Sequence, residues 1–414
     1  MMGSDLPYAV VIDIDHINGL QTARIFHFRS IKVIGIANNL NHYCARTRAC
    51  TRIIKSSTKT GELIDTLLLL GNEFDQKPLL IPSQDTSVLL VSRNRDILTH
   101  LYHIALPAET TVEMLLDKPS FYAYASKMNL PIARYYLIKT RSEAEQAIAS
   151  LNPPLIIKPP LKSPKWEANT KIKAYKVNDR NQFLKVYDTC KDWADILMAQ
   201  EWIEGSDVDL YSCNCYFNEQ NEPLVSFISK KLRQYPPVTG NTSLGIECRA
   251  DEVKNISLDL FKRVGFHGLG YVEIKKDARN GKYYIIEPNI GRPTGRSALA
   301  EAAGVEILYT MYCDKIGLPL PDQIEQKYVG VKWVHIRTDL MSAYYYWKNK
   351  DLTFSNWLKS LKGKKFYAVY SLKDPLPFLA EIYTGIKIML EALIFRLFKI
   401  GRKHPAPLEG ILKQ

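Results

Sequence analysis

The chain has 414 residues, of which 46% are hydrophobic and 24% are charged. This length exceeds one ordinary domain, so two or three domains are expected, and the composition is that of a soluble globular protein. The formal net charge of +12 favours anionic partners: nucleotide phosphates, an acidic substrate or a membrane surface. Because basic residues are scattered until the C-terminal end, no nucleic-acid partner is expected.

The seven cysteines form no C-x-x-C pair and have no matching histidine spacing. Cys213 and Cys215 alternate on a predicted strand, where packed thiols are a better interpretation than zinc ligands. An odd number of cysteines and the absence of a recognisable secretory signal favour a reducing cytoplasm.

The N-terminal region alternates apolar runs with helical patterns. The strands Tyr8–Ile14 and Lys32–Ala37 flank a predicted helix, Leu20–Phe28. This order is typical of a doubly wound α/β sheet, whose ligands bind beyond the carboxyl ends of the strands. The loop Asp15–Gly19 has one glycine, so it is no dinucleotide fingerprint. His16 in this loop is predicted to cap a helix, with a catalytic base as the alternative.

The middle of the chain contains a predicted helix that begins near Pro119 and another that begins at Ser142, with a capping box to Glu145. The buried strand Leu155–Lys158 ends in a lysine. A lysine-containing loop, Leu161–Lys171, separates it from the next strand. This arrangement predicts a mobile cover for phosphate groups, with a solvated surface hairpin as the alternative.

The stretch Gly268–Arg296 is predicted to form a β-hairpin. If Arg279–Gly281 is the loop, Glu273 lies opposite Glu287, and Asn289 lies on the same face as Glu287. Like charges so placed destabilise a sheet unless a cation separates them. Carboxylate and amide oxygens suit Mg²⁺, so we expect a magnesium site here, with a hairpin whose acids face water as the alternative.

A helix is predicted after the hairpin, at Ser297–Gly304. Its N-terminus follows Arg292, Thr294 and Arg296, so helix N–H groups and guanidinium groups are expected to meet there. Both bind anions.

Six motifs occur in a fixed order, and together they resemble a known superfamily. They are Asp117-Lys118, Pro154–Pro159, Gln200–Ile203, Gly205 with Asp207, Lys230-Lys231, and the set Glu273, Glu287 and Asn289. From Tyr8 to Pro321 the sequence resembles the ATP-grasp superfamily, in its carboxylate–amine ligase branch, and more loosely D-aspartate ligases.

The resemblance implies an α/β ATP-grasp fold. Its parts would be an N-terminal doubly wound α/β domain at 1–115, a small α+β lid at 116–199 and an α+β catalytic subdomain for ATP and Mg²⁺ at 200–322. A helical extension at 323–414 would follow, beyond the region of resemblance.

The resemblance also implies residues that bind ATP. The phosphates would contact Lys118, Lys158 and either Lys230 or Lys231, and strand alternation places the last two on opposite faces. The adenine would lie against the segment made of Gln200, Glu201, Trp202 and Ile203. Asp207 would bind the ribose hydroxyls.

The same resemblance assigns Glu273, Glu287 and Asn289 as Mg²⁺ ligands and Arg292 as a catalytic arginine alongside Lys231. The sequence departs from the family pattern in two places. The lid loop has Lys162, Lys165 and Trp166 where relatives have glycines, and one extra residue separates Asn289 from Arg292.

The implied reaction is ATP- and Mg²⁺-dependent ligation of a carboxylate to an amine through an acyl phosphate, with release of ADP and phosphate. The preferred substrates are an amino acid and a cell-envelope precursor. Two alternatives stay open. One is a ligase that makes a small soluble dipeptide or metabolite, and the other is a non-catalytic nucleotide-binding protein that docks on a membrane.

Beyond the region of resemblance, Tyr344–Trp347 and Trp357 are predicted to be packing residues, with an aromatic glycan-binding surface as the alternative. The helix Phe378–Lys399 carries a broad apolar stripe, interrupted by charges too often to span a bilayer. With a basic cluster at Arg396, Lys399, Arg402 and Lys403, this helix suits the surface of an anionic membrane, on its cytoplasmic side. Alternatively, the stripe packs on the protein or pairs with a second subunit in a homodimer.

Overall fold

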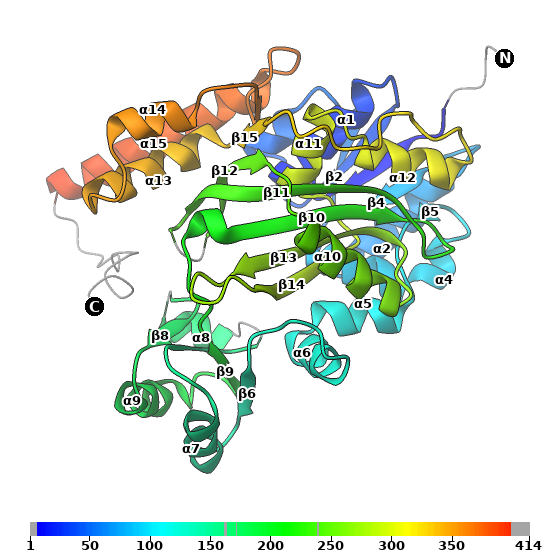
Figure 1. Ribbon diagram of the computed structural model, residues 1–414. Helices are drawn as coiled ribbons and strands as arrows, with labels where there is room; N and C mark the ends of the chain where they lie inside the picture. Colours follow the sequence, from blue (N-terminus) through cyan, green and yellow to red (C-terminus); the bar gives the residue numbers. More distant parts are fainter. Residues whose placement is uncertain (1–5, 161–163, 171, 238–239, 399–414) are drawn as a thin grey trace. The chain divides into compact units, whose positions relative to one another are not determined.

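The computed structural model describes residues 6–160, 164–170, 172–237 and 240–398, with side chains as far as residue 391 (Figure 1). The predicted roles of Lys162, Lys399, Arg402 and Lys403, and that of the Arg396 side chain, fall outside the described part. The chain divides into two compact units. Of the described residues, the large unit comprises those in the ranges 6–116, Ser206–Glu273 and Pro288–Leu393, and the small unit comprises those in the ranges Asp117–Gly205, Ile274–Glu287 and 394–398.

The N-terminal part of the large unit is a parallel sheet of five strands in the order β3-β2-β1-β4-β5, with helices around it (Figure 1). The strands are β1 Ala9–Ile12, β2 Val33–Ala37, β3 Arg52–Lys55, β4 Leu79–Ile81 and β5 His103–Ile104. The helices are α1 Ile17–His27, η1 Tyr43–Arg46, α2 Glu62–Gly71, α3 Asp85–Arg93, α4 Arg95–Leu98 and α5 Glu109–Leu116.

This sheet confirms the predicted doubly wound α/β domain. Strands β1, β2 and β4 are buried at every position, which explains why the sequence shows continuous apolar runs there and no alternation. His16 is the N-cap of α1, and its Nδ1 accepts a hydrogen bond from the Asn18 N–H at 3.3 Å. The capping interpretation of His16 is therefore confirmed.

A mixed sheet of seven strands forms the second layer, in the order β14-β13-β10-β11-β12-β15-β16. The strands are β10 Leu210–Phe217, β11 Pro223–Tyr235, β12 Asn241–Glu247, β13 Gly268–Lys276, β14 Tyr283–Ile290, β15 Lys332–Val334 and β16 Lys365–Tyr367. The helical elements of this part are η2 Asp207–Asp209, α10 Asp251–Arg263, α11 Gly295–Ala302 and α12 Ile307–Ile316. Cys213 and Cys215 are buried free thiols on β10, as the sequence predicts.

The turn of the β13–β14 hairpin differs from the expected three-residue loop. The Asp277 N–H donates to the Lys282 carbonyl at 2.8 Å, so four residues lie inside the turn. At the other end of the hairpin, the Gly291 N–H donates to the Leu269 carbonyl at 2.7 Å, which is the pair that the expected register predicts. The predicted hairpin is therefore correct, but its loop is one residue longer than expected.

The small unit contains a four-stranded sheet in the order β6-β9-β7-β8. Its strands are β6 Tyr135–Ile138, β7 Leu155–Lys158, β8 Tyr175–Val177 and β9 Leu197–Glu201, and its helices are α6 Lys118–Lys127, α7 Arg141–Ser150, α8 Pro164–Asn169 and α9 Arg180–Cys190. Trp166, Phe183 and Tyr187 pack in its core.

Two local predictions in the small unit are wrong. The capping box of α7 joins Thr140 and Glu143, two residues earlier than the predicted pair, because Thr140 takes the extended backbone conformation that a cap requires. The expected mobile loop contains α8, and the Trp166 side chain on that helix is only 1% exposed. Burial of this indole explains a large aromatic residue in a segment that otherwise contains lysines.

The C-terminal extension adds α13 Ile336–Lys348, α14 Phe354–Ser360 and α15 Leu376–Phe398 to the large unit (Figure 1). The prediction that the aromatic run 344–347 packs is wrong at its ends, because Tyr344 and Trp347 are 63% and 59% exposed. Within the described residues, no helix has both the length and the apolar character to cross a membrane.

A buried ion pair fastens this extension to the N-terminal sheet. Arg24 on α1 donates from Nε to Asp374 Oδ2 at 2.9 Å, and its other nitrogens reach the carbonyls of Val369 and Asp374. Thr47 also donates to Asp374 Oδ2, at 2.5 Å. Both charged side chains are almost completely buried, so each stabilises the other only while its partner is present.

Asp374→Ala is therefore expected to lower the free energy of unfolding by about 3–5 kcal/mol, because the Arg24 charge would remain buried without its carboxylate. Denaturant unfolding of the purified protein measures this change. Asp351→Ala, at an exposed acid of the same extension, is the control and should change stability little. Equal effects of the two substitutions would contradict the role assigned to the buried pair.

Candidate functional site

The small unit brings four of the predicted residues together. Asp117 caps α6 and accepts a hydrogen bond from the Ser120 N–H at 3.0 Å, which places Lys118 in the first turn. Lys118 Nζ lies 3.1 Å from Glu287 Oε2. Lys158, at the end of β7, donates to Gln200 Oε1 at 3.2 Å.

The buried Gln200 side chain contacts two other residues of the small unit. Its Oε1 holds Lys158, and its Nε2 donates to the Tyr122 hydroxyl at 2.6 Å. The Tyr122 hydroxyl in turn donates to the Ile286 carbonyl at 3.1 Å. Gln200 therefore positions the ammonium group of Lys158. The sequence does not indicate this relay, because Tyr122 lies 78 residues before its partner.

Burial and the neighbouring Lys118 charge lower the pKa of Lys158 to about 8, although Glu287 acts in the opposite direction. Two ammonium groups thus share one carboxylate. An anion that binds beside the two ammonium groups stabilises their charge. A phosphate oxygen can accept the hydrogen bonds that these groups otherwise donate to water.

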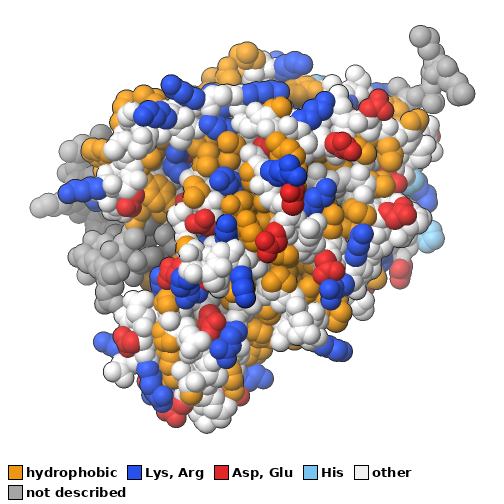
Figure 2. Space-filling view, in the orientation of Figure 1, with side chains coloured by type: hydrophobic (Ala, Val, Ile, Leu, Met, Phe, Trp, Pro, Cys, Tyr) orange, Lys and Arg blue, Asp and Glu red, His pale blue; other side chains and the backbone are white. Residues whose placement is uncertain are grey.

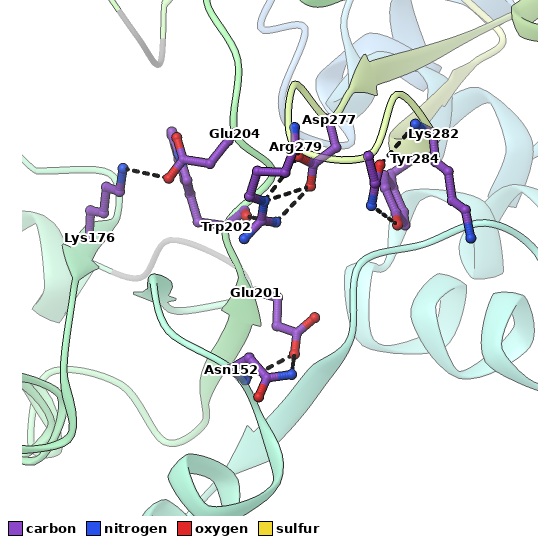
Figure 3. Close-up of polar contacts among 10 residues, drawn as sticks. Asn152, Lys176, Glu201, Trp202, Glu204, Asp277, Arg279, Lys282 and Tyr284 are labelled. Carbon is purple, nitrogen blue, oxygen red and sulfur yellow. Dashed lines mark hydrogen bonds and ion pairs between the residues drawn. The ribbon is translucent and has the colours of Figure 1, made fainter.

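The segment after β9 is held by several polar contacts within the small unit (Figure 3). The Glu201 and Trp202 N–H groups donate to the carbonyls of Arg134 and Pro154, both at 2.9 Å. Arg279 donates from Nη2 to the Trp202 carbonyl at 3.0 Å and pairs with Asp277 at 2.6 Å (Figure 3). In the segment that the sequence assigns to adenine, these bonds occupy the N–H groups of Glu201 and Trp202 and the carbonyl of Trp202.

Ile203 is the exception in this segment. Its side chain is buried, but its backbone N–H donates no hydrogen bond to any described residue. Trp202 is held by two cations, since the ammonium groups of Lys176 and Lys275 lie 4.8 and 4.6 Å from the centre of its ring. The structure therefore presents the Ile203 amide on a rigid segment.

The large unit contains a second charge cluster, on β11, β13 and α11. Lys231 Nζ lies 3.7 Å from Glu273 Oε1, and Arg296 Nη2 donates to the same oxygen at 3.1 Å. Burial raises the pKa of Glu273, but the two cations outweigh it and lower this pKa to about 2. Lys230 has its side chain on the other face of β11, because neighbouring residues alternate. The structure thus brings Lys231, and not Lys230, to Glu273.

Arg292 also belongs to this cluster. It pairs through Nε with Asp85 at the start of α3, and its Nη2 donates to Asn289 Oδ1 at 2.7 Å. Gly291 has φ +69°, and a Cβ atom there would lie 2.3 Å from Leu106 Cδ2. The extra residue before Arg292 is accommodated in this turn, which lets the guanidinium group reach back to Asn289.

Asp207, the expected ribose ligand, lies half-buried on η2. Gln234 Nε2 donates to Asp207 Oδ1 at 2.7 Å, and the Tyr346 hydroxyl donates to Oδ2. Sequence reasoning missed both partners. Gln234 lies on a part of β11 that no motif covers, and Tyr346 lies in the extension, outside the region of resemblance.

The expected magnesium ligands have a suitable donor set. Glu273 and Glu287 supply carboxylate oxygens, and Asn289 supplies an amide. The Asn289 Oδ1, which would be the ligand atom, accepts a hydrogen bond from Arg292 Nη2 at 2.7 Å, and the Nδ2 is a buried donor without a partner in the described part of the chain. Among the described residues, no group of three or more His, Cys, Asp or Glu is arranged to hold a metal. The candidate set has only two acids, and its residues fit a cation that retains water ligands.

Curated relatives resemble the chain at low identity. The D-aspartate ligase of Enterococcus faecium (strain Aus0004) is 21% identical over 261 residues, which cover 59% of this chain and 61% of that protein. The D-alanine–D-alanine ligase of Acinetobacter baumannii (strain ATCC 17978) is 23% identical over 193 residues, 42% of this chain and 57% of that protein. The chain therefore matches less than two thirds of the length of either relative. No family model matches it.

Solved structures share the fold over most of the chain. N5-carboxyaminoimidazole synthetase from Staphylococcus aureus has a TM-score of 0.60 and 16% identity, covering 79% of this chain and 82% of that one. Biotin carboxylase from Campylobacter jejuni has a TM-score of 0.60 and 12% identity, covering 76% and 72%. With the observed order of elements, these matches confirm the expected fold. The chain thus shares the fold of these solved structures and resembles the curated ligases, in agreement with the sequence resemblance to the carboxylate–amine ligase branch of the ATP-grasp superfamily.

Proposed function

We propose that the protein is an ATP- and Mg²⁺-dependent ligase that joins a carboxylate to an amine. The observation that carries the proposal is an excess of cations in each charge cluster. In the small unit two lysines share one acid, and in the large unit one lysine and two arginines share two acids. Polyanionic phosphate groups would neutralise this excess.

The proposed reaction has two steps. A carboxylate oxygen of the first substrate attacks the γ-phosphorus of ATP, which gives an acyl phosphate and ADP. The amine of the second substrate then attacks the acyl carbon and displaces phosphate. Phosphoryl transfer depends on positioning and charge neutralisation more than on covalent help, so a site rich in lysine and arginine suits it.

Individual residues receive the following roles in this proposal. Lys118 and Lys158 bind phosphate oxygens, and Lys231 and Arg292 stabilise charge on the transferred group. The Ile203 amide binds the adenine edge, while Asp207 binds the ribose. Glu273, Glu287 and Asn289 would hold Mg²⁺, which neutralises phosphate charge when bound.

An amino acid and a cell-envelope precursor are the proposed substrates. The names of the two curated relatives support an amino acid or its D-enantiomer as one partner. A ligase that makes a small soluble dipeptide or metabolite is the second candidate, because the same chemistry serves both. A nucleotide-binding protein without turnover would not need the metal ligands together with the phosphate lysines.

Purified protein incubated with ATP, Mg²⁺ and panels of amino acids and envelope precursors should release ADP only when both substrates are present. The acyl-phosphate route requires ADP and phosphate as products. Nucleotide chromatography after turnover distinguishes this route from adenylation. Stoichiometric AMP would contradict the proposed mechanism.

The pH dependence of turnover tests the assignment of Lys158. Its ammonium group is charged below its pKa of about 8, so kcat/KM for ATP should decline as the pH rises through that value. In Lys158→Arg the side chain stays charged at all accessible pH values, so this alkaline decline should disappear even if the rate is lower. A decline that persists unchanged in the variant would assign the titration to another group.

We also propose that the protein docks on the cytoplasmic face of a membrane through α15. Leu379, Tyr383 and Met389 are 56%, 70% and 64% exposed, which favours an external partner over packing on the protein itself. More than half of the exposed large hydrophobic residues of the described chain lie in the extension. In the space-filling view, hydrophobic and basic side chains are interspersed over its helices (Figure 2).

The surface charge of the extension is complementary to anionic lipid. Three of its acids, Asp339, Asp374 and Glu381, are buried in ion pairs and three, Glu325, Asp351 and Glu391, are exposed, whereas most of its lysines are exposed. Exposed lysines beside exposed apolar residues suit an interfacial helix. A second copy of the chain is the alternative partner, and it would make a homodimer.

Flotation with anionic liposomes should recover the wild-type protein, and Ile386→Glu with Met389→Glu should abolish recovery, because charges would enter the apolar interface. Leu69→Glu, at a residue 75% exposed on α2, is the matched control and should float normally. If wild type and double variant both stay in the soluble fraction at low salt, α15 does not dock on lipid. Sedimentation then tests the dimer.

A further inference from the structure

A continuous series of polar contacts crosses the large unit from the C-terminal extension to Glu273. Tyr346 on α13 donates to Asp207 Oδ2, and Gln234 on β11 donates to Oδ1 at 2.7 Å. Gln234 Oε1 then accepts from Lys231 Nζ at 3.2 Å, and Lys231 lies 3.7 Å from Glu273 Oε1. The extension therefore holds one end of a network whose other members belong to the ATP-grasp core.

The direction of each hydrogen bond in this network is determined by chemistry. An ammonium group only donates, so Gln234 must turn its oxygen toward Lys231 and its Nε2 toward the Asp207 carboxylate. Asp207, as a carboxylate, only accepts. The Tyr346 hydroxyl must therefore donate to it, and burial together with the Asp207 charge raises the pKa of Tyr346 and keeps that hydroxyl protonated.

Two donors hold the Asp207 carboxylate without filling it. Each carboxylate oxygen has about two lone-pair sites, and one donor reaches each oxygen here. Acceptor sites remain for a vicinal diol, whose two hydroxyls both donate. Because Tyr346 and Gln234 approach different oxygens, together they fix the plane of the carboxylate as well as its position.

We propose that Tyr346 is a positioning residue for Asp207 and that, through it, the C-terminal extension sets the preference of the site for a nucleotide with ribose hydroxyls over a deoxynucleotide. This inference rests on the proposed binding of ATP. The extension would then take part in nucleotide recognition, although it lies outside the region that resembles the superfamily.

Calorimetric titration of the full chain with ATP, 2′-deoxy-ATP and 3′-deoxy-ATP, in the presence of Mg²⁺ and without carboxylate or amine substrates, tests this role. The wild type should bind ATP more tightly than either deoxynucleotide. In Tyr346→Phe the affinity for ATP should fall about tenfold, the scale of one hydrogen bond to a charged group, while the affinity for the deoxynucleotides should fall much less. The ratio of affinities is the readout, because a general loss of stability would lower all three alike.

Tyr344→Phe is the matched control, since it removes a hydroxyl from an exposed residue of the same helix and should leave the ratio unchanged. Gln234→Met removes the other donor to Asp207 from a different element and should also reduce the ratio, which keeps the test valid if Tyr346→Phe does not fold. A wild-type ratio in folded Tyr346→Phe, or in Gln234→Met when the first variant does not fold, overturns the inference. Absence of ATP binding by the wild type would instead overturn the proposed function, and with it this inference.

Discussion

Pairing of buried charges is the constraint on which the rest of the large unit depends. A buried guanidinium group costs several kcal/mol unless a carboxylate and further hydrogen bonds compensate it. Arg24 in the N-terminal sheet domain and Arg233 on β11 both meet this requirement with acids from the C-terminal extension, Asp374 and Asp339. The extension is thus an integral part of the fold, because without it two buried cations would lose their partners.

The need to pair buried charges also applies to the two candidate charge clusters, but there the pairing is incomplete. Around Glu273 and Glu287 the cations outnumber the acids, and the Asn289 amide keeps a buried nitrogen without a partner in the described part of the chain. In a structural ion pair such as Arg24–Asp374, other protein groups supply the hydrogen bonds of the charged side chains. A cluster with excess positive charge is completed only by an anion, which is the physical basis for proposing phosphate chemistry here.

The extension also has two faces with different physical characters. Tyr346 on α13 reaches inward to Asp207, while Trp347, the next residue, is largely exposed. Helical geometry separates successive side chains by about 100°, so one helix can contact Asp207 and also present an apolar outer surface. The proposed ribose preference depends on α13 and the proposed membrane docking on α15, so the two proposals can be tested by separate substitutions.

Much of the local structure could be predicted from the sequence. Continuous apolar runs identified the buried parallel strands, because strands covered on both faces need no polar positions. The strand Leu155–Lys158 has the predicted limits, since prolines flank it on both sides. Errors came where local signals compete: the Thr140–Glu143 box has the same spacing as the predicted one, and the turn after Lys276 accommodates an additional residue.

For the candidate site, too, the sequence indicates the residues and the tertiary structure determines their contacts. Lys118, Lys158, Asp207, Glu273 and Glu287 could be proposed from the sequence, because the resemblance rests on particular side chains in a fixed order along the chain. Which partner each of them meets was decided by the tertiary structure alone. Gln200 turns to Lys158, Lys231 rather than Lys230 reaches Glu273, and Tyr346 approaches Asp207 from 139 residues away. Hydrogen bonds and buried ion pairs act over a few ångströms of space, so separation along the chain carries no trace of them.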